Sequence, residues 1–337
     1  KAGRLQVLFA PTEKLSALFN VHARDLDGTA AVFRANVLTK GSNQLNANYD
    51  RDKVAYDAGG GNHQRYKGYG ASANIQYDLG GATLTSITAY ENTHGYSRGD
   101  IDGGNPGGPG FIPFQSDTQD SIPNLFQWTQ EIRLASDTDG PLTWQVGGFY
   151  FDTKYAIETD PFFMPPTRLQ QKNKAWAVFG QASYAVTEKL TLTGGLRYTE
   201  DDKDLKVMFG NAAPAVSVSD DHLSWDVSAL LKLDENVSVY GKVASGFRGP
   251  SIQGRDIAFG SPASTARSET IMSYEFGLKS ELFDRRVRLN GAMFAYTVDD
   301  PQFSAVGGGS NSNRLINAKK GEAFGVELDS EFVITPN

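Results

Sequence analysis

Residues 176–199 read WAVFGQASYAVTEKLTLTGGLRYT, and they indicate the fold class more clearly than any other part of the chain. From Trp176 to Val186 one alternate set is apolar or small, and the other includes Gln181 and Ser183. From Leu190 to Thr199, leucines and a tyrosine alternate with threonines and an arginine. Alternation with a period of two residues is typical of half-buried strands. The stretch therefore predicts two antiparallel strands joined by the polar turn 187–189.

Short polar turns recur along the chain. They lie at residues 12–14, 80–81, 137–140, 187–189, 234–236, 284–286 and 335–337. Each interval between two turns holds two strand-like runs, separated by a longer segment rich in Gly, Asp and Asn. Turns that are short on one side and long on the other are typical of a membrane β-barrel with tight periplasmic turns and long extracellular loops.

This pattern predicts thirteen strands, at 4–10, 15–24, 66–79, 83–98, 125–136, 142–158, 172–186, 190–207, 223–233, 237–248, 268–283, 287–304 and 322–334. Most of them are long enough for a tilted strand to cross a bilayer, which takes about 9–11 residues. Aromatic residues stand near the expected strand ends, as lipid interfaces favour; they are Tyr90, Trp144, Tyr150, Trp176 and Tyr198. We therefore predict an all-β fold, an antiparallel transmembrane β-barrel fragment. A large soluble β protein with core aromatics is the alternative.

Composition narrows the function classes. The chain has 337 residues and 39% hydrophobic residues, yet no run of ~18 apolar residues that would span a bilayer as a helix. A net charge of -7 argues against a nucleic-acid partner, which would usually require a basic face. The absence of Cys excludes disulfides and thiolate chemistry, and the four His show no metal-ligand spacing. We therefore expect no cofactor, no metal and no catalytic site.

The strand count carries a further expectation. Thirteen is odd, whereas bacterial single-chain barrels close with an even number of strands, and an open edge in lipid leaves backbone groups unsatisfied. Residues 1–10 already have the pattern of a strand and no signal-peptide pattern. We expect residues 1–337 to form a partial barrel domain from which strands are missing.

Four segments resemble barrel strands of TonB-dependent outer-membrane receptors. The first is 130–136 with the strand 142–150, and it contains Glu131 and Arg133. The second, 239–250, ends in the family's Gly-Phe-Arg-x-Pro pattern, and the third and fourth are 273–280 and 321–329. The remaining residues that carry the resemblance are Gly246, Phe247, Pro250, Glu275, Gly277, Gly325 and Glu327. The matches occur in the family's order but cover only about 125–337.

The resemblance implies a function and partners. Members are described as 22-stranded barrels closed by an N-terminal plug, which take up scarce bulky nutrients such as ferric siderophores, cobalamin or glycans. It implies the outer membrane of a Gram-negative bacterium as location, the lipid bilayer as surroundings, and the TonB complex as energy source through an N-terminal region missing from this chain. No plug or TonB box is recognisable here. A passive porin-like diffusion channel and a soluble secreted β-rich protein remain as alternatives.

Candidate ligand contacts lie in the long loops and at strand ends. His94, Tyr96 and Arg98 precede a Gly-rich segment that carries Phe111 and Phe114, two apolar contacts for a bulky solute. Asp100 and Asp102 supply oxygen atoms of the kind that bind Ca²⁺. Arg248 and Arg255 could attract an anionic solute. The alternatives are ordinary rim residues, glycines that serve turns, and a structural role for the Phe247 to Pro250 strand end.

Overall fold

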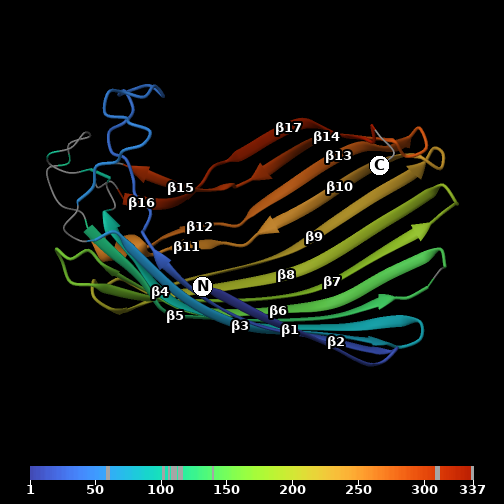
Figure 1. The fold of residues 1–337 in the computed structure, drawn as a ribbon, viewed down its shortest axis with the longest axis horizontal. Helices are drawn as coiled ribbons and strands as arrows, with labels where there is room; N and C mark the ends of the chain where they lie inside the picture. Colours follow the sequence, from blue (N-terminus) through green and yellow to red (C-terminus); the bar gives the residue numbers. More distant parts are fainter. Residues whose placement is uncertain are drawn as a thin grey trace.

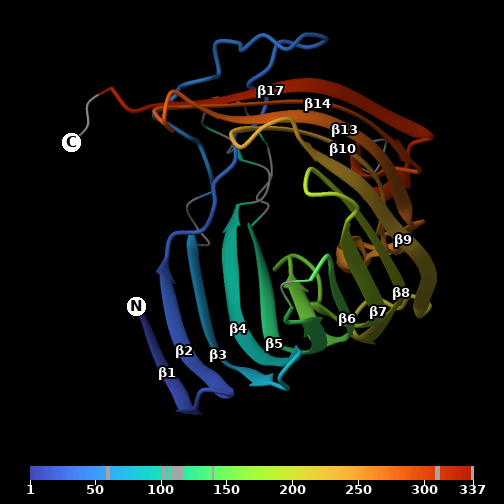
Figure 2. The same ribbon diagram turned by 90° about the vertical axis from the view of Figure 1, so that its right-hand side faces the viewer.

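The computed structural model describes residues 1–57, 61–100, 103, 104, 107, 112, 117–138, 140–307 and 312–334. Thirteen strands form one antiparallel sheet in the order β1-β2-β3-β4-β5-β6-β7-β8-β9-β10-β13-β14-β17, and the sheet curves around a lumen (Figures 1 and 2). The strands are β1 (Ala2–Thr12), β2 (Leu15–Gly28), β3 (His63–Asp78), β4 (Ala82–Asp100), β5 (Asp117–Ser136), β6 (Leu142–Asp160), β7 (Thr167–Ala185), β8 (Leu190–Phe209), β9 (Val216–Lys232), β10 (Val237–Arg248), β13 (Glu269–Leu282), β14 (Val287–Asp299) and β17 (Lys320–Phe332). The predicted antiparallel barrel fragment is confirmed.

Two small sheets and one short helix lie at the loop end of the strands (Figure 1). They comprise β11 (Ser251–Gln253) with β12 (Ser264–Ala266), β15 (Gln302–Gly307) with β16 (Ser312–Asn317), and the 3₁₀-helix η1 (Arg255–Phe259). The predicted strand 287–304 is divided, because Asp300 has a φ of 52° and Pro301 has no N–H to donate. Within the described residues, no helix is long and apolar enough to cross a membrane.

The short turns lie together at one end of the sheet and the long connections at the other (Figure 1). The predicted turn 335–337 lies outside the described residues. Several strands extend beyond their predicted bounds at the loop end; β5 starts at Asp117 rather than 125, and β9 at Val216 rather than 223. These extensions consist mostly of polar residues, so the apolar alternation used for the prediction ended before the backbone pairing did.

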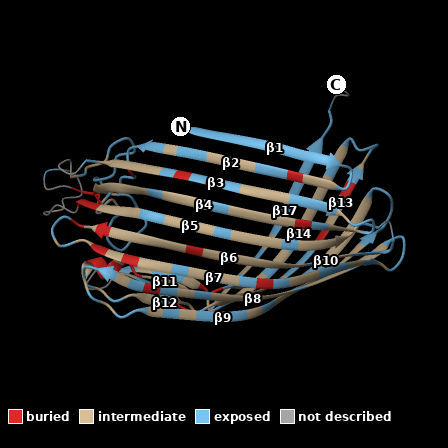
Figure 3. Cartoon of the chain, turned by 90° about the horizontal axis from the view of Figure 1, so that it is seen from below, coloured by how far each residue is buried: buried red, intermediate tan, exposed pale blue. Residues whose placement is uncertain are grey.

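The two faces of the sheet differ in their side chains. Large apolar residues stand on the convex, outer face of β8, where Leu192 and Leu196 are 43% and 58% exposed. A band of aromatic residues crosses the same face from β3 to β8, with ring pairs between Tyr69 and Tyr90, Trp128 and Tyr150, and Trp176 and Tyr198. Along β7, exposed residues alternate with less exposed ones from Lys172 to Phe179, whereas the edge strand β1 is exposed throughout (Figure 3). The outer face therefore has the features of a lipid-facing wall, with its aromatic band toward the loop end.

Close packing on the inner face explains two of the family-pattern glycines. A side chain at Gly277 would overlap the ring of Tyr240, which lies opposite it on β10. At Gly325 it would lie 2.5 Å from Cζ of Phe294, which lies opposite on β14. Each glycine therefore leaves space for an aromatic ring from the neighbouring strand.

Candidate ligand-binding site at the extracellular mouth

The Gly-Phe-Arg-Gly-Pro strand end directs the chain into the lumen. Residues 249–267, here named the luminal ledge, connect β10 to β13 and lie on the concave side of the sheet (Figure 2). Gly249 and Pro250 are buried, and a side chain at Gly249 would overlap the carboxylate of Asp201 on β8. The ammonium of Lys203 donates to Asp201 at 2.6 Å and to the carbonyl of Pro250 at 2.7 Å. The strand end thus has the structural role considered for Pro250.

An apolar core joins the luminal ledge to the barrel wall. Ile257 of η1 is 1% exposed and packs against Leu169 of β7 and Leu205 of β8, whose side chains point inward. Gly254 permits this contact, because a Cβ there would lie 2.5 Å from Leu205 Cδ1. Asn211 donates to the carbonyls of Ile257 and Ala258 at 3.0 and 3.1 Å. The ledge is therefore packed as part of the wall.

Arg255 projects from the luminal ledge toward the wall of β5. Its Nε and one Nη each lie 3.2 Å from Oδ2 of Asp120, whose Oδ1 accepts a hydrogen bond from Thr159 at 2.6 Å. The guanidinium also lies 5.1 Å from the ring centre of Phe259. The Arg255 and Asp120 side chains remain 35% and 38% exposed. A solute that enters the mouth can therefore reach a positive and a negative group held side by side.

Tyr66 borders the same part of the mouth. Its side chain shares the inner face of β3 with Gly68, and burial, followed by the nearby Asp120 carboxylate, raises the pKa of the phenol. Tyr66 lies on the loop side of the aromatic band, outside the bilayer-spanning part of β3. The phenol therefore stays neutral and able to donate a hydrogen bond.

His94, Tyr96 and Arg98 lie on the outer face of β4. They share this face with Tyr90 of the aromatic band, because side chains alternate along a strand. Arg98 forms an ion pair with Asp117 at 2.9 Å, and its guanidinium lies 4.2 Å from the ring centre of Phe162. His94 is exposed. The structure therefore separates these three residues from the mouth cluster around Arg255.

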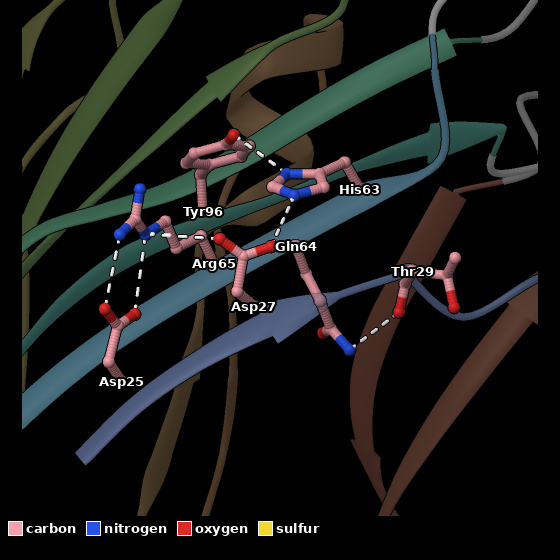
Figure 4. Close-up of polar contacts among 7 residues, drawn as sticks. All are labelled: Asp25, Asp27, Thr29, His63, Gln64, Arg65 and Tyr96. Carbon is pink, nitrogen blue, oxygen red and sulfur yellow. Dashed lines mark hydrogen bonds and ion pairs between the residues drawn. The ribbon is translucent and has the colours of Figure 1, made fainter. Parts of the chain in front are cut away.

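Tyr96 belongs to a polar cluster that joins β2, β3 and β4 (Figure 4). The ring of His63 lies between the Tyr96 hydroxyl and the Asp27 carboxylate, 2.9 Å from each. Arg65 binds Asp25 through two contacts of 3.4 and 3.2 Å. The Arg65 guanidinium holds the pKa of the Asp25 carboxyl below its usual range, chiefly through this hydrogen bond. The cluster ties together three strand ends above the aromatic band.

The remaining predicted contacts have different surroundings. Arg248 is exposed and lies 3.5 Å from Glu269, and Phe247 stacks on His222 with ring centres 5.0 Å apart. Asp100 is buried and accepts backbone N–H groups of Asp57 and Gly103 at 2.9 and 3.2 Å. Phe111, Phe114 and Asp102 lie outside the described residues.

The family-pattern charges face the lumen. Glu131 and Arg133 form an ion pair of 3.5 Å on the inner face of β5. Glu275 accepts a hydrogen bond of 2.5 Å from the hydroxyl of Tyr240, and Glu327 of β17 lies opposite Ala292 of β14. Among the described ranges, no group of three His, Asp or Glu side chains is arranged to hold a metal ion.

Sequence reasoning missed the residues that hold the mouth together. Asp120 lies between the predicted strands 83–98 and 125–136. Asp201 and Lys203 lie in the predicted strand 190–207 and were not singled out as candidate contacts, yet they are only 15% and 14% exposed. The alternation on β8 was the available signal, since it places both residues on the inward face with Leu205.

Comparison with protein families agrees with this architecture. Residues 15–335 match the family model "TonB dependent receptor-like, beta-barrel". The chain belongs to this family. The match covers nearly all of the chain, including the N-terminal part in which no family motif was found. TonB-dependent receptors are transporters, so the prediction that the chain is not an enzyme is confirmed.

Solved structures show the same fold at low sequence identity. The ferric yersiniabactin uptake receptor FyuA from Yersinia pestis is 19% identical with a TM-score of 0.76, covering 99% of this chain and 49% of that chain. The E. coli K12 ferric-catecholate import receptor Fiu is 15% identical with a TM-score of 0.71, covering 99% and 55%. The copper transporter OprC is 13% identical with a TM-score of 0.73, covering 100% and 51%.

The chain thus spans about half the length of the solved structures it matches. A curated sequence, the uncharacterized protein YxaL of Bacillus subtilis, is 31% identical over 84 residues, covering 24% of this chain and 20% of that protein. So short a match assigns no function.

Proposed function

We propose that this chain is the barrel part of an active outer-membrane transporter that takes up a bulky, scarce solute, foremost a ferric siderophore or similar iron chelate. The observation that carries the proposal is a barrel wall that matches the family model and has a polar inner face. At its mouth, the side chains of Arg255 and Asp120 are accessible to a solute. Receptors for iron chelates among the matched structures support the solute class. A vitamin or glycan remains within the proposed range.

The proposal includes the partners and the location. The TonB complex energises uptake through a part of the receptor outside residues 1–337. A plug domain in that part closes the lumen. The surrounding bilayer is the outer membrane of a Gram-negative bacterium. The outward apolar residues and the aromatic band support the membrane setting.

We assign the ligand contacts to two zones. Arg255 and Arg248 form the inner zone, where the guanidinium groups attract anionic oxygen atoms of the solute. His94, Tyr96 and Arg98 form the outer zone, at the base of the loop that carries Phe111 and Phe114. The three side chains of the outer zone face away from the lumen, so they can contact the solute only before it enters the lumen.

The test uses the complete gene in its own host and ⁵⁵Fe-labelled ferric citrate and a ferric tris-catecholate as probes. We expect uptake that is lost on deletion of the gene and on dissipation of the proton gradient. Uptake that persists without the gradient would indicate the passive channel instead. Equal uptake of both probes with and without the gene would contradict an iron-chelate function.

A further inference from the structure

The luminal ledge is secured at both ends. The side-chain amide of Gln302 donates to the carbonyl of Gly249 at 2.8 Å and to that of Arg267 at 3.0 Å. Asn317 adds a hydrogen bond of 2.9 Å to the Arg267 carbonyl. The start and the end of the ledge are therefore held together by the segment that follows β14.

The middle of the ledge is held as firmly. Ile257 and Ala258 are each 1% exposed, and the core of Ile257, Leu169 and Leu205 is the apolar cluster found among the described residues. Asp256 is 6% exposed and accepts the backbone N–H of Asn313 in β16. Opening the ledge would expose this core and leave a buried carboxylate without its donor, both of which are costly.

A fixed ledge has a consequence for entry. It occupies part of the mouth beside β6, β7 and β8, and it holds Arg255 against Asp120 across the lumen side of the wall. We propose that the luminal ledge is a fixed selectivity element of the mouth, in which the buried Ile257 is a positioning residue for Arg255. An incoming anionic group meets this pre-positioned guanidinium and competes for it with Asp120. The inference rests on the proposed function, since it concerns which solutes enter.

The position of the ledge can be tested without transport. The chain has no Cys, so a single introduced thiol reports on its own surroundings. Ala258→Cys and Thr265→Cys, a buried and an exposed ledge position, are made in the complete gene product and treated in cells with a membrane-impermeant maleimide. We expect rapid labelling of Thr265→Cys and protection of Ala258→Cys. Equal labelling rates would overturn a fixed ledge.

Two variants of Ile257 then separate positioning from general stability. Ile257→Ser should expose Ala258→Cys to the maleimide, whereas Ile257→Val should keep it protected. In ⁵⁵Fe uptake, Ile257→Ser should raise the half-saturating concentration of the accepted chelate several-fold, with an unchanged maximal rate per receptor in the membrane. Ile257→Val should restore the original value. If Ile257→Ser does not assemble, Leu205→Ala loosens the same contact from the wall.

The outcomes distinguish the two proposals. An unchanged half-saturating concentration in a variant whose Ala258→Cys is exposed would overturn the positioning role and leave the proposed function intact. Absence of energised uptake by the unsubstituted protein would overturn the proposed function, and the labelling rates would still decide whether the ledge is fixed.

Discussion

Leu196 provides the sharpest test of which face of the wall meets lipid. It stands on the outer face of β8 and is 58% exposed. We expect Leu196→Arg to destabilise the barrel, because an arginine there must lie in the hydrocarbon or distort the bilayer.

The depth of Leu196 sets the size of the effect. β8 begins at Leu190 beside the short turn, so Leu196 lies six residues along the strand. At about 3.3 Å per residue this is roughly 20 Å, or about 15 Å of depth for a strand tilted by about 40°. Tyr198 of the aromatic band follows two residues later, so Leu196 lies between the middle of the hydrocarbon layer and its loop-side interface. An arginine costs about 2–4 kcal/mol at the midplane of a barrel and about 0–1 kcal/mol near an interface, so we expect a cost of about 1–2 kcal/mol at this level.

Gln181 is a matched control at the same depth. It lies on the inner face of β7 opposite Gly195, the residue next to Leu196, and it is exposed to the lumen. The Gln181 Cγ and the Asp226 carboxylate both lie close to Gly195. An arginine at position 181 would therefore have the negative charge of Asp226 nearby. We expect Gln181→Arg to leave the free energy of unfolding nearly unchanged.

The assay is urea unfolding of the receptor in phospholipid vesicles, followed by tryptophan fluorescence and by the heat-modifiable mobility of the barrel. A loss of about 1–2 kcal/mol for Leu196→Arg with little change for Gln181→Arg supports the assigned faces. Equal losses for the two variants, or a larger loss for Gln181→Arg, would refute the assignment.

Three further predictions concern the glycine contacts, the apolar core and the polar cluster. Gly277→Val should lower the yield of folded barrel in the membrane, because its side chain overlaps the ring of Tyr240. Leu205→Ala should destabilise the ledge by about 2–5 kcal/mol and speed proteolysis at Arg255, with less effect on the barrel itself. Arg65 lowers the pKa of Asp25, so the contact between them stabilises the folded protein at pH values above the usual pKa of an aspartate. This stabilisation is lost as the pH falls through the lowered pKa of Asp25 in the folded protein. Arg65→Met should therefore remove this acid-dependent part of the thermal stability.

Matched variants control each of these predictions. Gly194 faces outward, and a Cβ there would meet only the carbonyl oxygen of Asp226, at 3.9 Å, so Gly194→Val should assemble normally. If Gly194→Val and Gly277→Val lowered the yield of folded barrel equally, the ring contact would be disproved. Leu192→Ala, outward on the same strand as Leu205, should leave proteolysis of the ledge unchanged. Arg51, whose side chain is 82% exposed, gives the control Arg51→Met; the pH argument fails if both arginine variants respond alike to acid.

Alternation along β8 and β7 was sufficient to predict strands and their two faces, because the side-chain direction in a strand depends on the local backbone alone. The same rule places His94, Tyr96 and Arg98 on the outer face with Tyr90, and it was available before the structure. The short turns likewise showed which strands are neighbours, since a tight turn leaves antiparallel pairing as the simplest outcome.

The mouth depended on contacts that no local pattern contains. Arg255 and Asp120 are 135 residues apart, and Ile257 reaches Leu205 only because residues 249–267 turn inward instead of outward. That choice follows from burial of three apolar side chains and from the hydrogen bonds that Lys203 of β8 and Gln302 of β15 donate to the ledge. The sequence by itself thus determined the wall and its two faces, through local backbone geometry. Only the tertiary structure decided which loop lines the lumen, because that depends on the free energy of packing distant segments together.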